Sequence, residues 1–297
     1  MGQRGRAVGG RRAPVARRHH RARPDERGRR GEYRHHPRRA DVMATLRVDA
    51  EKAVAVLTID DPAKLNAMGR EFWPGLREAL ASLAADGQTR AVIITGAGDK
   101  AFSAGGDIAS FAELTDVAAK REFQQDCMRT FAAVEESPLP VIAAVNGYAM
   151  GGGCELALAC DVVVAAENAT FAMPEAAVGL VPGFGVLRAP SVIGRHWTKL
   201  MMFAGERADA ATALSIGLAQ KVVPAAELMA TARDLAERMA GMAPLALATG
   251  KNLVNRGVDR GEFDHSTGAL TALHATADAA EGIAAFKDKR PPRFEGR

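Results

Sequence analysis

Two glutamates in an apolar part of the chain are the residues best suited to acid–base chemistry. Glu155 stands inside the apolar run of residues 141–166, and Glu175 follows Pro174. Two carboxylates in one apolar cleft cannot both ionise easily, because desolvation and mutual repulsion raise the pKa of at least one of them. Such a pair can hold a water molecule, deliver its oxygen and return a proton elsewhere. Alternatively, Glu155 faces solvent on its helix and Glu175 forms a surface ion pair.

Two glycine-rich turns could supply the second part of such a site, a pocket for an oxyanion. Gly151, Gly152 and Gly153 precede the sequence CELALA, which predicts a helix that begins at the glycines. The first N–H groups of a helix have no partner within it, and the helix dipole favours negative charge there. The turn at residues 100–110 also joins an apolar strand to a helix, so each turn could direct one N–H at the same oxygen. The alternative is that both turns are ordinary tight strand-to-helix connections without a role in binding.

Few other residues form a pattern that indicates chemistry. The sequence contains no GxxxxGK[ST], HExxH or GxSxG motif and no Cys/His cluster with metal-ligand spacing, so no metal site is expected. The isolated side chains of His196, His265 and His274 are interpreted as structural or exposed. The cysteines favour free thiols in a reducing compartment over a disulfide framework; they are Cys127, Cys154 and Cys160.

The elements that must position these residues follow from the hydrophobic pattern. Residues 45–48 and 53–59 are expected to pair as strands around a turn at residues 49–51, and residues 72–83 to form an amphipathic helix. Further strands are expected at residues 91–95, 141–145, 161–165 and 221–223, and helices at residues 107–137, 195–204, 208–215, 224–242 and 244–254. This order predicts an α/β chain with a helical C-terminal portion.

The first 40 residues differ in composition from the rest of the chain. They hold 14 arginines, four histidines and three acidic residues, whereas residues 41–297 have 25 basic and 32 acidic residues and a net charge of about −7. A segment with so much charge and so few large apolar residues cannot bury enough surface to order itself. We expect residues 1–42 to form a disordered, dispensable extension, with Met43 as the natural start. A nucleic-acid-binding arm is an alternative, because arginines bind phosphate.

Five segments occur in a characteristic order along residues 44–295. They are PAKLNAM, KAFSAGGDI, PVIAAVNGYAMGGGCELALACDVVVA, FAMPEAAVGLVPGFG and EGIAAFKDKRPPRF. In this order and spacing they closely resemble the enoyl-CoA hydratase/isomerase family, the crotonases. The resemblance implies a spiral of ββα units in residues 43–225, which contain the acyl-CoA site, and a helical trimerisation region in residues 226–297. It also implies a homo-oligomer, either a trimer or a dimer of trimers.

The resemblance assigns roles to particular residues. It implies that the N–H groups of Gly106 and Gly152 bind the thioester oxygen, and that Glu155 and Glu175 activate and position water. Other residues are expected to bind the acyl-CoA: Leu65, Asn66, Ala67, Ala104, Asp107, Ile108, Gly183, Phe286 and Lys289. No separate cofactor is implied, because coenzyme A is part of the substrate.

The resemblance predicts hydration of a trans-2-enoyl-CoA to a 3-hydroxyacyl-CoA, in fatty acid or related acyl-CoA degradation in the cytoplasm. Isomerase members of the family commonly need one acid only, at the position of Glu175. Resemblance to the 3-hydroxyisobutyryl-CoA hydrolases is opposed by Glu155, which those enzymes lack. The segment GFGVLRAPSVIG lacks the Thr-Gln pair of many hydratases and leaves the acyl preference open. A membrane span is not expected, and RNA binding is a remote alternative that the acidic body opposes.

Overall fold

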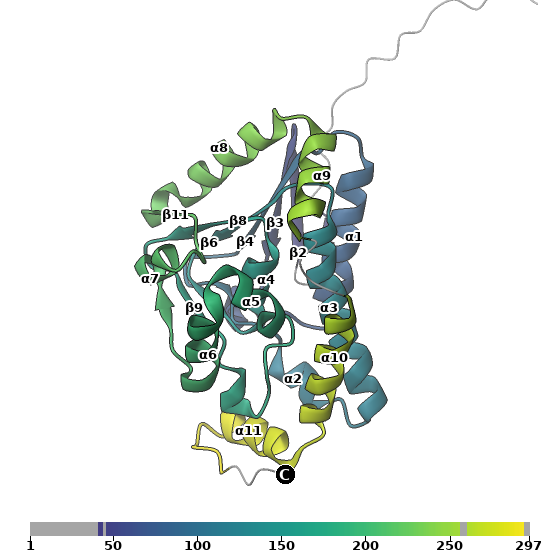
Figure 1. Ribbon diagram of the computed structural model, residues 1–297, viewed down its shortest axis with the longest axis vertical. Helices are drawn as coiled ribbons and strands as arrows, with labels where there is room; N and C mark the ends of the chain where they lie inside the picture. Colours follow the sequence, from purple (N-terminus) through teal and green to yellow (C-terminus); the bar gives the residue numbers. More distant parts are fainter. Residues whose placement is uncertain (1–40, 44–45, 256–259, 294–297) are drawn as a thin grey trace, which may run out of the picture. The chain divides into compact units, whose positions relative to one another are not determined.

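The computed structural model describes residues 41–43, 46–255 and 260–293 (Figure 1). In this part of the chain the larger sheet has the strand order β1-β2-β3-β4-β6-β8-β11. Its strands are β1 (Asp41–Met43), β2 (Leu46–Glu51), β3 (Val54–Ile59), β4 (Ala91–Gly96), β6 (Val141–Val145), β8 (Val162–Ala166) and β11 (Lys221–Val223). The first three pair antiparallel, and from β3 onward all neighbours are parallel. Parallel strands are covered on both faces, which explains their continuous apolar sequences.

Helices cover both faces of this sheet. Successive side chains of a strand point to opposite sides, so in β4 Val92 and Ile94 join the larger core whereas Ile93 joins a smaller one. The larger core includes α1 (Phe72–Ala85) and α3 (Val117–Glu136), which pack on each other. The smaller core lies under α8 (Leu228–Ala240), on the other side of the sheet in Figure 1.

A smaller sheet brings the glycine-rich turns and Glu175 together. Its strand order is β10-β9-β7-β5 among the described residues, and its strands are β5 (Ala101–Ser103), β7 (Tyr148–Met150), β9 (Thr170–Ala172) and β10 (Ala208–Asp209). Strand β5 follows β4, β7 follows β6 and β9 follows β8, and helical segments come next: α2 (Ile108–Ala112), α4 (Gly152–Ala159) and η2 (Glu175–Val178). Because β5, β7 and β9 are parallel neighbours, the turns that follow them lie side by side. This confirms the predicted ββα units.

The remaining helical segments flank the two sheets and α3. They are η1 (Pro62–Lys64), α5 (Gly185–Val192), α6 (Gly194–Ala204), α7 (Ala210–Ser215), η3 (Ala225–Glu227), α9 (Pro244–Val254), α10 (Arg260–His274) and α11 (Ala277–Lys287). Helix α10 packs along α3, and α11 packs on η2. The described residues include no helix with the length and apolar character that a membrane crossing requires.

Three expectations differ from the structure in detail. The first hairpin turns at Lys52, which has a φ of 55°, and not at residues 49–51, so β2 is longer than predicted. The strands of the smaller sheet were not predicted, because two or three residues are too short to show a period of two. The predicted extension lies outside the described residues except at its end, where β1 includes Asp41 and Val42 and pairs with β2.

Candidate active site

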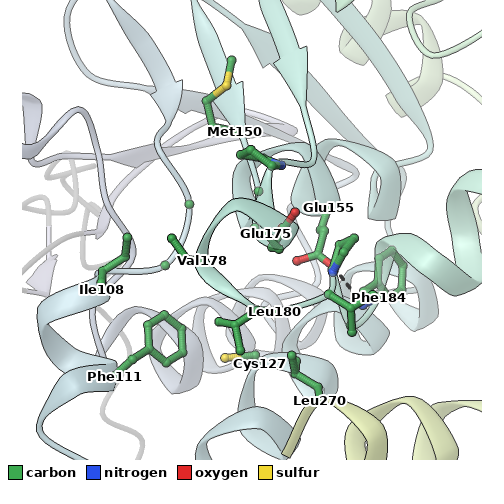
Figure 2. A pocket seen from close by; sticks show the side chains of 18 of the residues that line it. Ile108, Phe111, Cys127, Met150, Glu155, Glu175, Val178, Leu180, Phe184 and Leu270 are labelled. Atoms are coloured by element: carbon green, nitrogen blue, oxygen red, sulfur yellow. Dashed lines mark hydrogen bonds between the residues drawn. The ribbon is translucent and has the colours of Figure 1, made fainter. Parts of the chain in front are cut away.

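A cavity of about 360 Å³ lies among the turns that follow β5, β7 and β9 and the helices α3 and α10. Glu155, Glu175, Gly106 and Gly152 all line it, so the structure brings together the four residues predicted to be catalytic. Figure 2 shows the two glutamate side chains turned toward one another. The rest of the wall is largely apolar and includes Ile108, Phe111, Cys127, Phe131, Phe184 and Leu270.

Glu155 is held in the cavity wall by its own hydrogen bonds. It lies in the first turn of α4 and is 6% exposed. Its Oε1 accepts the backbone N–H groups of Phe184 and Gly185, each at 2.8 Å. Phe184 is the N-cap residue of α5, so the carboxylate caps the N-terminus of that helix, where the unpaired N–H groups and the dipole favour negative charge.

Glu175 has the opposite environment. It begins the short 3-10 helix η2, and both of its carboxylate oxygens are buried without a hydrogen-bond partner in the described part of the chain. A Cβ added at Gly151 would lie 3.0 Å from its Oε1, so a side chain there would press on the carboxylate. A buried carboxyl group without a partner is costly when ionised. The geometry therefore favours a protonated Glu175 that faces the cavity.

Burial raises the pKa of both glutamates. Desolvation raises the pKa of Glu155 to about 7, although the N–H groups of Gly185 and Phe184 favour its ionised form. Desolvation also raises the pKa of Glu175 well above the usual range, and the charge of Glu155 raises it further. Two backbone N–H groups stabilise the anion of Glu155, whereas only its own backbone N–H favours the anion of Glu175, so we assign the first ionisation of the pair to Glu155. Near neutral pH the site then contains one base and one acid.

The two glycine-rich turns lie in close contact through their backbone atoms. Gly105 has a φ of 96°, and a Cβ there would lie 2.7 Å from the oxygen of Met150 and 3.2 Å from the nitrogen of Gly152. A Cβ on Gly152 would in turn lie 3.5 Å from the nitrogen of Gly106. Within the described ranges, neither the Gly106 nor the Gly152 N–H donates to a backbone acceptor. Both glycines line the cavity, as an oxyanion site requires.

The position of Glu175 also depends on the last helix. Helix α11 approaches η2 through Gly282, where a Cβ would lie 2.6 Å from the Cα of Val178. On the other side of the contact, Gly179 has a φ of 74°, and a Cβ there would lie 2.8 Å from the nitrogen of Ala279. Backbone atoms cannot move aside as a flexible side chain does, so these glycines set the distance between α11 and the turn that carries Glu175.

The residues expected to bind acyl-CoA fall into two groups. Ala104, Ile108, Gly183 and Phe286 line the cavity, whereas Leu65, Asn66, Ala67, Asp107 and Lys289 do not. Leu65 and Asn66 instead border a separate cavity of about 140 Å³, so their predicted contact with the substrate stays a prediction.

Two of the second group have clear structural roles. The buried amide of Asn66 donates to the oxygens of Ala97 and Ala101 and accepts the N–H of Asp61. Asp107 caps α2 by accepting the N–H of Ala109 and forms an ion pair with Lys64.

The sequence did not identify several residues of the cavity wall. Gln124, Cys127, Met128 and Phe131 line it from one face of α3, with the spacing of three and four residues that a helix face requires. His274 also lines the cavity, and its ring is hydrogen-bonded to Gln124. The three- and four-residue spacing on α3 could be read from the sequence, but the residues that face α3 across the cavity could not.

Thiol and metal chemistry find no support in this site. Burial raises the pKa of Cys127 well above the usual range, which opposes a thiolate, and all three cysteines are free. Among the described residues no group of histidine, cysteine, aspartate or glutamate side chains is arranged to hold a metal ion.

Comparisons with known proteins agree on one family. Residues 49–297 match the family model described as enoyl-CoA hydratase/isomerase. A short-chain-enoyl-CoA hydratase of Clostridium acetobutylicum is 37% identical over 256 residues, which cover 84% of this chain and 96% of the relative. A carnitinyl-CoA dehydratase of Salmonella typhi is 39% identical over 262 residues, which cover 85% and 99% of the two chains.

Solved structures give the same result. The crystal structure of an enoyl-CoA hydratase from Mycobacterium avium subsp. paratuberculosis has a TM-score of 0.76 and 32% identity, and the match covers 86% of this chain and all of that one. A carnitinyl-CoA hydratase from Mycobacterium avium has a TM-score of 0.76 and 35% identity with the same coverage. The similarity therefore extends over sequence and fold together.

Proposed function

Because this chain belongs to the enoyl-CoA hydratase/isomerase family, we propose that Glu155 and Glu175 jointly add water to a trans-2-enoyl-CoA and give a 3-hydroxyacyl-CoA. The observation that carries this proposal is the pair of buried carboxyl groups with raised pKa values, which share one cavity with two N–H groups. The site thus offers an acid, a base and an oxyanion pocket around a single substrate position.

Each group has one task in the reaction. The N–H groups of Gly106 and Gly152 bind the thioester oxygen and stabilise the negative charge that develops on it. Ionised Glu155 takes a proton from water while the water oxygen bonds to the β-carbon. Protonated Glu175 gives its proton to the α-carbon, and the double bond becomes a single bond. A proton then passes from Glu155 to Glu175, directly or by way of solvent, and restores the starting state.

The substrate proposed is a short acyl chain. Relatives named short-chain-enoyl-CoA hydratase and crotonyl-CoA hydratase are each 37% identical to this chain. A largely apolar cavity of about 360 Å³ suits a few carbon atoms together with the thioester. An opening for the coenzyme A arm near α11 is supported by Phe286, which lines the cavity and is 60% exposed.

The alternative within the family is an isomerase that needs one acid only. It would use Glu175 and leave Glu155 with a structural role at the N-terminus of α5. The raised pKa of Glu155 favours the hydratase, since a purely structural cap would gain nothing from a carboxylate that is protonated below about pH 7.

The deciding experiment compares hydration and double-bond isomerisation across short, medium and branched enoyl-CoAs. The hydratase proposal expects wild-type protein to hydrate a short substrate fastest, and both Glu155→Gln and Glu175→Gln to lose hydration. Full hydration by Glu155→Gln, with no activity in Glu175→Gln, would contradict the two-acid reaction and favour a single-acid enzyme.

Assembly, location and pathway are further proposals. A trimer or a dimer of trimers is supported by large apolar side chains that are exposed on α6 and α9, namely Leu200, Phe203, Leu245, Leu253 and Val254. Light scattering at micromolar concentration would test it, and a monomer would contradict it. A reducing, cytoplasmic location is supported by the three free thiols. A role in acyl-CoA degradation is the pathway that we propose for this reaction.

A further inference from the structure

The cavity wall contains a buried polar pair that the proposed reaction does not use. Gln124 of α3 and His274 of α10 both line the cavity, and each is only 5% exposed. Phe286, which also lines the cavity, is 60% exposed, so the polar pair belongs to a more enclosed part of the wall. The coenzyme A arm has to reach solvent, so we assign the enclosed part of the wall, with the polar pair, to the acyl chain.

The distance of the pair from the reacting carbons follows from α3. Cys127 is close enough to Glu155 for the charge of that glutamate to raise its pKa. Gln124 is one helical turn away from Cys127 on the same face, about 5 Å along the helix axis. The polar pair therefore lies roughly one helical turn from the catalytic carboxylates, within reach of a substituent at the end of a short acyl chain.

The pair is joined by one hydrogen bond and fixed by its neighbours. The side-chain nitrogen of Gln124 lies 2.8 Å from Nε2 of His274. The ring of Phe111 stacks on the imidazole, with centroids 5.5 Å apart, and Lys120 Nζ donates to the backbone oxygen of His274 at 2.7 Å. Burial and the charge of Lys120 lower the pKa of His274 to about 4, so the imidazole is neutral at pH 7.

A neutral imidazole and an amide in this arrangement retain at least one donor and one acceptor. If the amide N–H donates to Nε2, the imidazole carries its proton on Nδ1; Gln124 Oε1 then remains free to accept, and Nδ1–H and the second amide N–H remain free to donate. If the amide is turned over, Nε2–H donates to Oε1 and leaves the amide N–H₂ and Nδ1 free instead. In both cases no further hydrogen bond of these side chains is found within the described residues. An apolar acyl end would leave both groups unpaired, at about 1–3 kcal/mol each.

We propose that Gln124 and His274 recognise a neutral hydrogen-bonding group, of the hydroxyl type, at the far end of the acyl chain. A hydroxyl can accept from the pair and donate to it at the same time. A carboxylate would find no buried cation in the described part of the cavity wall, because Lys120 does not line the cavity and Arg207, which does, is exposed. The inference rests on the proposed function, since it names the acyl group that the same site takes.

The test compares matched substrates. Butenoyl, pentenoyl and hexenoyl thioesters of coenzyme A are measured with and without a terminal hydroxyl, and the readout is the ratio of kcat/KM within each pair. At the best length we expect wild-type protein to prefer the hydroxylated substrate about tenfold, the effect of one net hydrogen bond. Gln124→Leu and His274→Phe should abolish or reverse that ratio. Preference for the unsubstituted substrate at every length, or an unchanged ratio in both variants, would overturn the inference.

Two neighbouring residues provide matched controls. Gln125 and His265 lie on the same helices but do not line this cavity, so Gln125→Leu and His265→Phe should keep the wild-type ratio. If Gln124→Leu fails to fold, Gln124→Met removes the same hydrogen-bonding groups in a side chain of similar length. Calorimetric binding of the saturated hydroxylated and unsubstituted thioesters separates the two proposals. A binding preference without hydration would contradict the reaction alone, and equal binding would contradict this inference alone.

Discussion

Replacing Glu155 tests whether one carboxylate both performs catalysis and holds the N-terminus of α5. Two variants separate these roles. In Glu155→Gln the amide oxygen can still accept the N–H groups of Phe184 and Gly185, which lie 2.8 Å from Oε1 in the wild type. In Glu155→Ala both N–H groups lose their acceptor in a buried position. The two variants therefore share the catalytic defect and differ in the structural one.

The expected magnitudes follow from these contacts. A buried donor left without a partner costs about 1–3 kcal/mol, so two of them make Glu155→Ala about 2–6 kcal/mol less stable than Glu155→Gln. Loss of the positioned base should lower kcat by a factor on the order of 10² or more in both variants. Binding of a saturated acyl-CoA should change little in Glu155→Gln, because the oxyanion site of Gly106 and Gly152 is intact.

The assays are urea unfolding for stability and, for activity, the loss of ultraviolet absorbance as water removes the conjugated double bond. Equal stability of the two variants would show that the contacts to Phe184 and Gly185 do not hold α5. A Glu155→Gln protein with wild-type kcat would refute the assignment of Glu155 as the base.

Other expectations concern the same pair and its support. The ratio kcat/KM should rise through about pH 7 as Glu155 ionises and fall at higher pH as Glu175 ionises, and Glu155→Gln should lose the acidic limb. Between pH 4.5 and 7 the folded state keeps protons on Glu155 and Glu175 that the unfolded chain releases, so the unfolding free energy should fall as pH rises; Glu155 contributes about 3 kcal/mol of that fall, and Glu155→Gln should make the slope shallower without abolishing it. The Glu155→Gln/Glu175→Gln double variant should be only slightly slower than either single variant, and multiplying defects would contradict joint action. Gly282→Ala should push on Val178 and reduce kcat by roughly 10- to 100-fold through Glu175, whereas Gly268→Ala, with open space around it, should not.

Features that depend on neighbours in sequence could be predicted well. The buried strands β4 and β6 are continuous apolar runs, and α4 begins at the glycines because they precede a helix-forming sequence. The catalytic pair was predicted for a related reason. A glutamate inside an apolar run either lies on a solvent-facing side of its helix or belongs to a functional site, and the family resemblance favoured a functional site for Glu155.

Features that depend on distant partners could not be predicted. Glu155 and the N–H groups that it accepts lie 29 and 30 residues apart, and no local pattern links them. His274 was interpreted as isolated because its partner, Gln124, lies 150 residues earlier. The hydrogen bonds of the Asn66 amide could not be predicted either, because their acceptors, the backbone oxygens of Ala97 and Ala101, lie 31 and 35 residues later in the chain. Tertiary hydrogen bonds decide such roles, and they are not a property of sequence spacing.

The close packing of α11 on η2 has a consequence for the motions of the protein. The two segments are about a hundred residues apart in sequence but touch through backbone atoms at Gly179 and Gly282, so we expect them to open together as one local unfolding unit. When they separate, Glu175 regains water, its pKa falls toward that of a free glutamate, and it loses its proton at neutral pH. Closing requires that proton to return. Opening of α11 is therefore coupled to proton release from Glu175, and closing is coupled to proton uptake. Amide hydrogen exchange in α11 should accelerate with pH more steeply than the intrinsic exchange rate of an unprotected amide does.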